Sequence, residues 1–537
     1  MARTPLFALL QRAARIARNA AKVDMPLEEF HERGMEMRVD ATRRRLLQGA
    51  AASLALAACA PITPRAIGGP EVVIVGAGIA GLSAAWSLRQ AGVPSRVYEA
   101  QARVGGRMLS LRDHFPNGQV IELGGELIDT GHVRIRKLAQ DLGLVLDDLL
   151  EGETAADTWW FDGRRIGEAE IVQALAPLVP AIIADVEALG DGALDYRDAN
   201  PAFRALDAMS IADWLDKHQV SGWLRKLIDV AYTTEMGLEI DQQSALNFLT
   251  FIGTEDADAF KIFGESDERF HVRGGNDLIP RTLASRMAES IHTGHVLEAV
   301  HADGDGVRLT FALDDGRVDI RARHVILALP FTLLRKVQID VPLPPHKRNA
   351  IDHLAYGTNA KLMIGYDRRA WRQHDANGAS MSDLPYQTTW ETSRKQAGEA
   401  GTLTNFTGGR HGVELGQGTP RAQAEAATAA LDRVWPGLAA LRTNAREARF
   451  HWPTHPWSLG SYACFRPNDW STLRGVMGEP VGPLFFAGEH CALDTQGFME
   501  GGCESGQLAA EAVLAQLRGV SSAPHFPIQA RRIARTA

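Results

Sequence analysis

The segment 71–99 constrains the fold more than any other part of this chain, and it reads EVVIVGAGIAGLSAAWSLRQAGVPSRVYE. Residues 72–75 form a short run of apolar, β-branched side chains, which predicts a buried strand. Residues 95–98 predict a second strand, and the apolar residues between the two follow a helical spacing. The glycines of a GxGxxG motif stand between the first strand and the helix: Gly76, Gly78 and Gly81. This order predicts a parallel βαβ unit of the dinucleotide-binding type.

The three glycines and the acid that ends the second strand have separate physical roles. The first glycine allows a tight turn, the second lets the main chain approach a pyrophosphate, and the third allows helix and strand to pack closely. The pyrophosphate then meets the free N–H groups at the start of the helix. Glu99 can accept hydrogen bonds from a ribose hydroxyl and would repel a 2′-phosphate, which disfavours NADP. NAD and FAD both remain compatible with this unit, as does a glycine-rich loop in an unrelated α/β protein.

Length, charge and cysteine content exclude several classes of protein. A chain of 537 residues has room for about two to four domains. The net charge of -8, from 57 basic and 65 acidic side chains, argues against nucleic-acid binding, because phosphate recognition needs a concentrated positive surface. The cysteines have no short paired spacing: they are Cys59, Cys464, Cys491 and Cys503. We therefore expect no disulfide framework and no metal site.

The residues that follow Glu99 distinguish between the two cofactors. The segment RVGGRMLS contains glycines, which permit close approach, and Arg107, whose planar guanidinium suits phosphate oxygens. With this segment the chain resembles the flavin-containing amine oxidases, in which the corresponding residues wrap the FAD diphosphate. The resemblance recurs in the family's order in IELGGELIDTG (121–131), HVRGGNDLIPRTLA (271–284), HVLEAV (295–300), HVILALP (324–330) and LFFAGEHCALDTQGFMEGGCESGQLAAEAVL (484–514).

The resemblance implies an α/β fold in which a Rossmann-like FAD-binding domain is interleaved with a mixed α+β substrate domain. The segments implied for the FAD-binding domain are 70–130, 270–330 and 475–518, and those for the substrate domain are 131–269 and 331–474. Between residues 135 and 260 the apolar spacing is mostly helical, whereas residues 360–470 mix strand-like runs with turns. Residues 519–537 are expected to form a loose tail.

The resemblance also implies which residues contact FAD. Val296 matches a position whose main chain meets the adenine, and Glu489 matches one near the ribityl chain. The full set is Gly76, Gly78, Ile79, Ala80, Gly81, Glu99, Ala100, Gly105, Gly106, Arg107, Gly124, Gly125, Glu126, Leu127, Val296, Gly488, Glu489, Gly497, Phe498 and Met499. Members with covalent FAD attach it through a cysteine where this chain has Ser461, so we expect non-covalent FAD.

Three residues are candidates for the reaction itself. Lys361, in the pattern GTNAK, matches a family lysine that holds a water at the flavin N5 atom. Tyr462 and Phe498 match two rings that flank the substrate amine, although many members have tyrosine at the second position. Aromatic faces guide an amine and exclude strongly hydrated groups. The alternatives are a strand-edge lysine that reaches solvent and two rings that belong to the core.

The substrate is less constrained than the cofactor. Family members that act on L-amino acids usually carry an arginine where this chain has Leu127, which lowers the expectation of a carboxylate bound in that way. Arg134 or an arginine of the helical region is an alternative cation. Glu126 and Asp129 are candidates for binding a second positive group, on a diamine or basic amino acid, or are loop acids bonded to the main chain.

Three functions follow from the resemblance. In the first, a primary amine or L-amino acid is oxidised to an imine, which gives an aldehyde or 2-oxo acid plus ammonia, and dioxygen becomes hydrogen peroxide. In the second, an amine dehydrogenase of the same fold passes electrons to a redox protein. In the third, the flavoprotein is not catalytic. We expect a small-molecule substrate and no nucleic-acid partner, and a homodimer remains an alternative to a monomer.

The N-terminal region has the layout of an export signal. Three arginines, at 43–45, precede an apolar run over 46–58, which is too short to span a bilayer as a helix, so no transmembrane helix is expected. This layout is typical of a secretory signal, and the arginines resemble a twin-arginine signal. Cys59 completes a lipobox-like motif, so lipid anchoring, cleavage without lipid and a buried alanine-rich helix are alternatives. We expect a periplasmic or otherwise exported protein, with residues 1–58 as signal region and initiation at Met37.

Overall fold

The computed structural model describes residues 71–252, 266–443 and 446–520. The expected export signal at 1–58 and the lipobox at Cys59 lie outside the described residues, as does the chain after residue 520.

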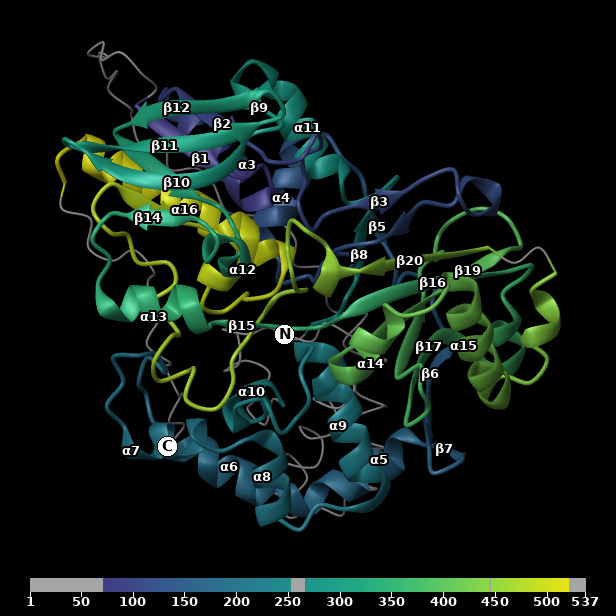
Figure 1. Ribbon diagram of the computed structural model, residues 1–537. Helices are drawn as coiled ribbons and strands as arrows, with labels where there is room; N and C mark the ends of the chain where they lie inside the picture. The colour runs from purple at the N-terminus through teal and green to yellow at the C-terminus, as the bar shows by residue number, and fades with distance from the viewer. Residues whose placement is uncertain (1–70, 253–265, 444–445, 521–537) are drawn as a thin grey trace, which may run out of the picture.

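A five-stranded parallel sheet lies in the upper part of Figure 1. Its strands, in spatial order, are β22 (Leu484–Phe486), β13 (His324–Leu327), β1 (Val72–Val75), β2 (Ser95–Tyr98) and β9 (Ile291–His292). All neighbouring pairs are parallel. β1 is buried along its whole length, as expected for a parallel strand covered on both faces. The two predicted strands at 72–75 and 95–98 are confirmed, and segments from distant parts of the chain complete their sheet.

Two helices from opposite ends of the chain pack against each other beside this sheet. Helix α3 (Ile79–Gln90) follows β1 directly, and α16 (Met499–Leu517) lies beside it (Figure 1). A Cβ atom added at Gly506 would lie 2.1 Å from the main-chain oxygen of Ala80, and one at Gly502 would lie 2.7 Å from Ile79 Cγ2. The two glycines therefore allow a helix contact too close for side chains on α16.

The third glycine of the GxGxxG motif performs the packing role predicted for it. A Cβ atom at Gly81 would lie 1.9 Å from the main-chain oxygen of Gly76, the last residue before the turn, and 3.3 Å from Ala328 Cβ. Gly76 has φ of +103°, a conformation that favours glycine. The turn between β1 and α3 is thus fixed by the absence of side chains at both positions.

A four-stranded sheet follows on the FAD-binding side of the molecule. Its spatial order is β12 (Gly316–Ala322), β11 (Gly306–Leu313), β10 (Val296–Asp303) and β14 (Gln338–Asp340). β10, β11 and β12 are antiparallel hairpin neighbours, whereas β14 runs parallel to β10. Residues beyond 330 therefore still pair with this sheet before the chain crosses to the other half of the molecule.

The other half is built on a seven-stranded sheet. Its spatial order is β20 (Glu447–His451), β16 (Ala360–Tyr366), β19 (Gly401–Thr407), β18 (Thr388–Glu391), β17 (Ala376–Ser382), β6 (Ala156–Phe161) and β7 (Arg164–Ile166). β16 is buried along its whole length. The mostly helical expectation for 135–260 is wrong for β6 and β7, because the aromatic run at 159–161 packs as a strand beside β17.

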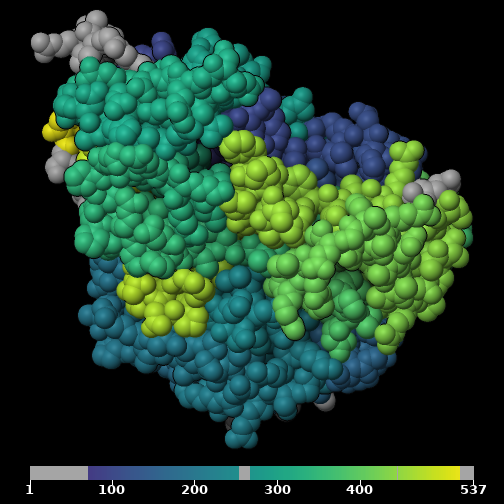
Figure 2. Space-filling view, in the orientation of Figure 1, coloured from purple at the N-terminus to yellow at the C-terminus, as the bar shows by residue number. Residues whose placement is uncertain are grey.

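The rest of the interval folds as helices at the bottom of Figure 1, and in Figure 2 the same residues form the lower surface of the molecule. They are α5 (Glu168–Leu175), α6 (Val179–Ala188), α7 (Pro201–Asp207), α8 (Ile211–Lys217), α9 (Gly222–Met236) and α10 (Ala245–Phe251). The further helices and strands of the described residues are β3 (Ser110–Leu111), β4 (Ile121–Glu122), α4 (Val133–Asp141), β5 (Leu146–Asp148), β8 (Phe270–Val272), α11 (Leu278–Arg286), α12 (Phe331–Leu334), α13 (Pro345–His353), β15 (Ala355–Tyr356), α14 (Gly409–Leu415), α15 (Pro420–Val434) and β21 (Ala463–Cys464).

One helical segment in the described part of the chain, Glu168–Ala188, has the length and hydropathy of a membrane span, with a value of 1.6. It consists of α5, a 3₁₀ turn and α6. The buried side chains of Ile171, Leu175 and Ile182 belong to the main hydrophobic core, where α5 packs on α9 and α6 packs on α7 and α10. Packing inside the protein therefore accounts for the apolar side of this segment.

Replacement of Gly81 by alanine should destabilise the FAD-binding half, because the added methyl group meets main-chain atoms that cannot rotate away. Overpacking of this kind costs about 1–3 kcal/mol. Urea unfolding and the flavin content of the purified protein measure the effect. Gly167→Ala is the matched control, because its added methyl group would meet no atom within 4 Å. Equal stability of the two variants would contradict the packing role of Gly81.

Candidate active site

A cavity of about 510 Å³ is lined by residues from both halves of the molecule. The turn after β1 and the segment after β2 supply one end, and β16, β18 and β19 supply side chains at the other. The cavity thus joins the predicted dinucleotide turn to the sheet that carries Lys361.

All but one of the predicted site residues line this cavity. They are Gly76, Gly78, Ile79, Ala80, Glu99, Ala100, Gly105, Gly106, Arg107, Gly124, Gly125, Glu126, Leu127, Val296, Lys361, Tyr462, Gly488, Glu489, Gly497, Phe498 and Met499. The exception is Gly81, which was predicted to contact the cofactor but does not line the cavity, because it faces the strand behind it.

The glycine turn has the features needed to bind a diphosphate. Gly78 is the N-cap residue of α3 and no side chain caps the helix, so its first N–H groups point toward the cavity end without a side-chain acceptor. Glu99 is buried, and its two carboxylate oxygens accept main-chain bonds from Ala77 at 2.7 Å and from Gln101 at 2.9 Å. Burial raises the pKa of Glu99 above its ordinary value.

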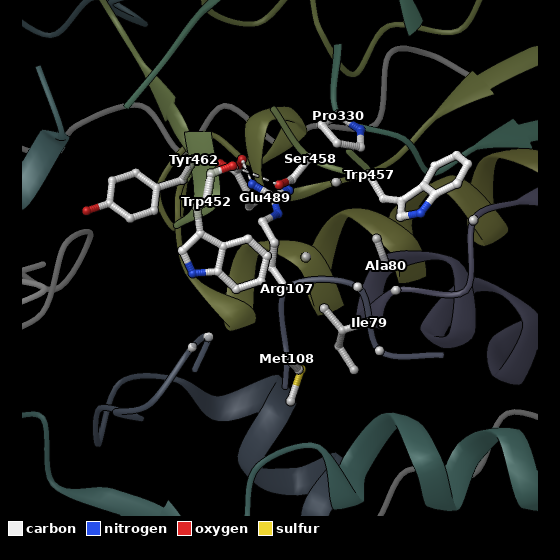
Figure 3. A pocket seen from close by; sticks show the side chains of 18 of the residues that line it. Ile79, Ala80, Arg107, Met108, Pro330, Trp452, Trp457, Ser458, Tyr462 and Glu489 are labelled. Carbon is white, nitrogen blue, oxygen red and sulfur yellow. Dashed lines mark hydrogen bonds and ion pairs between the residues drawn. The ribbon is translucent and has the colours of Figure 1, made fainter. Parts of the chain in front are cut away.

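Arg107 and Glu489 connect the first and last predicted FAD segments (Figure 3). Arg107 Nη1 lies 2.7 Å from Glu489 Oε1 and donates a 2.8 Å bond to the main-chain oxygen of Ser461. Glu489 also accepts main-chain bonds from Ala463 at 3.2 Å and Gly497 at 2.9 Å. The Glu489 carboxylate thus bonds three other segments of the cavity wall. The Arg107 guanidinium is held in place by its bonds to Glu489 and Ser461.

Lys361 forms a buried ion pair that the sequence did not predict. Its Nζ atom lies 2.7 Å from Glu126 Oε2 and also donates to the main-chain oxygens of Gly124, at 2.8 Å, and Glu122, at 3.2 Å. The exposed side-chain fractions are 6% for Lys361 and 7% for Glu126. Lys361 therefore does not reach solvent from a strand edge, and its three N–H donors all have protein acceptors.

Two further side chains bond the Glu126 carboxylate, one from strand β18 and one from the residue that follows it. The Glu126 Oε1 atom accepts bonds from Trp390 Nε1 at 2.8 Å and from Thr392 Oγ1 at 2.5 Å. Burial raises the pKa of Glu126, but the Lys361 ammonium and these hydrogen bonds outweigh burial and bring the pKa below its ordinary value. Glu126 is thus ionised, and its charge is neutralised by the ion pair with Lys361. It is therefore not available to bind a substrate cation.

The two predicted rings lie in different surroundings. Tyr462 packs against Trp390 and Phe406, and its hydroxyl donates a 2.9 Å bond to the main-chain oxygen of Glu235. Phe498 lies at the start of α16, with its ring centroid 5.0 Å from that of His132. Both rings line the cavity, so neither belongs only to the core.

Several lining residues were missed by the sequence analysis. They include Glu268, Asn359, Trp390, Phe406, Trp452 and Trp457. Trp390 is the most informative, because its ring lies 5.3 Å from Lys361 Nζ while its indole N–H bonds Glu126. A tryptophan in the strand-like segment QTTWE was the available signal, but the strand order that brings it to Lys361 is a tertiary property.

Arg134, the alternative cation for a substrate carboxylate, makes its contacts outside the cavity. Arg134 does not line the cavity, and its Nη1 atom donates a 2.5 Å bond to Gln507 Oε1. Among the lining residues in the described part of the chain, the only arginine is Arg107, which pairs with Glu489.

Asp129, by contrast, lies in an acidic part of the wall. Burial raises its pKa to about 7 and raises that of Glu268, which also lines the cavity, well above its ordinary value. His132, beside Asp129, has its pKa lowered by burial to about 3 and is neutral.

Comparison with known proteins identifies the family. The family model described as flavin containing amine oxidoreductase matches residues 79–514. This chain belongs to that family. FAD is therefore its cofactor, and the prediction of a flavin-dependent amine oxidoreductase with a mixed α/β fold is confirmed. The glycine turn, the uncapped start of α3 and Arg107 fit the diphosphate, and Val296 and Glu489 also line the cavity.

Related proteins cover most of the chain. An L-amino acid dehydrogenase of Synechocystis is 27% identical over 468 residues, which are 83% of this chain and 95% of the relative. An L-amino-acid oxidase of Pseudechis australis is 24% identical, over 82% of this chain and 86% of its own length. A cyclohexylamine oxidase from Brevibacterium oxydans has the same fold, with a TM-score of 0.74, 23% identity and coverage of 84% of this chain and 100% of that structure.

The Lys361–Glu126 pair should be strongly coupled energetically. Lys361→Met or Glu126→Gln alone leaves one buried group without its partner and should cost about 3–5 kcal/mol of unfolding free energy. The double variant should cost clearly less than the sum of the two. Urea unfolding of the four FAD-loaded proteins measures this coupling. Lys226→Met is the control, because its ion pairs with Asp162 and Asp383 lie at the surface; strict additivity at 126 and 361 would contradict the pair.

The flavin should be released by acid. The cysteines of the described residues, Cys464, Cys491 and Cys503, are buried and none lines the cavity, while Ser461 Oγ donates to Asn359 Oδ1 at 2.7 Å. Trichloroacetic acid precipitation of the yellow protein should therefore leave its whole flavin absorbance in the supernatant. Colour that stays with the washed pellet would show a covalent bond.

Proposed function

We propose that this protein catalyses the oxidative deamination of a primary amine or L-amino acid. The substrate carbon that bears the nitrogen loses a hydride equivalent and becomes an imine, which water hydrolyses to an aldehyde or 2-oxo acid plus ammonia. Dioxygen takes up the electrons and is reduced to hydrogen peroxide. The bound flavin supplies the hydride acceptor for this chemistry.

The observation that carries the proposal is the meeting of three features in one cavity. The dinucleotide turn, the buried Lys361 and the rings of Tyr462 and Phe498 all line it, although they come from segments far apart in the chain. A flavin bound along the predicted FAD residues would place its reactive part between the turn and these side chains. This supports an oxidation over a purely structural use of the cofactor.

The residues of this chain prepare the amine for the reaction. The rings of Tyr462, Trp390 and Phe406 form an apolar group at one side of the cavity, which excludes water and favours the neutral amine. Tyr462 is fixed through its hydroxyl bond to α9, so its ring has a defined orientation for the substrate. Lys361 is held by Glu126 and two main-chain oxygens, and we propose that a water shares its ammonium during turnover.

A dehydrogenase of the same fold is the second candidate. The Synechocystis relative named as an L-amino acid dehydrogenase supports this candidate, as does the twin-arginine-like signal at residues 43–45. We propose that the protein is exported with its flavin bound. Fractionation of cells that express the full chain, with and without Arg43→Lys and Arg44→Lys, tests this export.

The amine reaction is tested by mixing the oxidised protein anaerobically with a panel of primary amines and L-amino acids. A substrate should bleach the flavin absorbance at about 450 nm. Admission of air should then restore the colour and release peroxide in equal amount. Slow return of colour in air, with fast return on addition of a redox dye, would favour the dehydrogenase. No bleaching by any amine would contradict both.

A further inference from the structure

Two buried carboxyl groups in the cavity wall have oxygens without hydrogen-bond partners. Asp129 and Glu268 both line the cavity and are 1% and 4% exposed. Asp129 Oδ2 and both carboxylate oxygens of Glu268 accept no hydrogen bond. Buried polar groups in native proteins are almost always bonded to protein, water or a ligand. Within the described residues, these three oxygens therefore mark a place that lacks a hydrogen-bond donor in bonding geometry.

Each of the two carboxyl groups is linked to one of the rings through a neighbouring residue. Asp129 Oδ2 is 3.4 Å from His132 Nε2, and the His132 ring is tilted by 58° against the Phe498 ring, with their centroids 5.0 Å apart. On the other side, Glu235 acts electrostatically on Glu268, and the Glu235 main chain bonds the Tyr462 hydroxyl. Asp129 is thus linked to Phe498 through His132, and Glu268 to Tyr462 through Glu235.

The local chain holds the pair in place. Asp129 Oδ1 accepts a 2.8 Å bond from the Glu268 main-chain N–H and a 2.9 Å bond from Ser266 Oγ. Glu268 has φ of +44°, a left-handed conformation that is uncommon for a residue with a side chain. A carboxyl group that is buried, unbonded and held on a strained residue has no stabilising role within the described structure.

The charges around Glu268 are mostly negative. Asp129, Glu235 and Asp157 all raise its pKa, after the larger effect of burial, and Arg394 alone lowers it. The Arg394 guanidinium donates to the Glu391 main chain, and the ammonium of Lys361 is taken by Glu126. His132 is neutral. A cation in this part of the cavity would meet an excess of acid and would favour the ionised carboxylates.

We propose that Asp129 and Glu268 bind a second cationic group of the substrate, an ammonium or guanidinium other than the amine that is oxidised. This rests on the proposed function and deepens it by giving the substrate class. An ammonium carries three donors and a guanidinium five, so either fills the three free oxygens. Diamines and basic L-amino acids share this chemistry, and the described cavity offers a substrate carboxylate no arginine other than Arg107.

The test compares substrates that differ only in the second charge. α,ω-Diamines of three to six carbons are paired with n-alkylamines in which a methyl group replaces the second amine, and L-lysine is paired with L-norleucine. The ratio of kcat/KM within each pair is the readout. The unmodified holoenzyme should favour at least one dication by about 10- to 100-fold, the usual range for a charged hydrogen bond. A preference among the diamines identifies the substrate as a diamine, and a preference for L-lysine identifies it as a basic L-amino acid.

Glu268→Gln should bring that ratio down to nearly one, since it keeps the shape of the side chain and removes its charge. Asp129→Asn should lower the ratio in the same direction. Glu511→Gln, an exposed acid on α16 outside the cavity, is the control and should keep the ratio of the parent protein. Flavin content and thermal unfolding of each variant show whether it has folded.

The outcomes separate this inference from the proposed function. If neither member of any pair reduces the flavin, the proposed function fails. If the parent protein oxidises the compounds that lack the second amine as well as their partners that carry it, the proposed function stands. The second-cation site is then overturned, whatever the variants do. A dication preference that Glu268→Gln and Asp129→Asn both leave intact also overturns it.

Discussion

The buried ion pair of Lys361 and Glu126 is the interaction on which the active site depends. It joins the loop after β4, on the FAD-binding side, to the interior strand β16 of the seven-stranded sheet. Removing two charges from water is costly, and the cost is offset only because every donor and acceptor of the pair is used, by main-chain oxygens on one side and by Trp390 and Thr392 on the other. The relative position of the two halves is thereby fixed at the point where substrate and cofactor are expected to meet.

Local sequence predicted the parts of the fold whose interactions are local. The βαβ unit at 71–99 follows from apolar spacing and from glycines that act within a single turn, and the structure reproduces it with β1, α3 and β2. The resemblance supplied the position of Lys361 but not its partner, because Glu126 is 235 residues away in the chain. The strand β6 was missed because its aromatic run stands beside a helical region and is stabilised by pairing with β17, which lies far along the sequence.

The acids of the cavity show why residue type alone is a poor guide to role. Glu126, Asp129 and Glu489 all appeared as plausible contacts for a ligand, yet Glu126 is bonded to Lys361 and Glu489 to Arg107. Glu268 was not predicted as a site residue, because an acid between a polar segment and a strand is typical of an exposed position. The folded chain buries Glu268 and leaves its oxygens without a donor in the described residues. Both properties depend on tertiary contacts of the residues before β8.

The contact between α3 and α16 has a consequence for how the protein is made. Gly502 and Gly506, which pack on that helix, are translated long after the glycine turn. Gly488, Glu489 and Phe498 also belong to the cavity wall. A nascent chain that lacks α16 therefore has no complete site, and we expect the flavin to bind in full only after α16 has been synthesised.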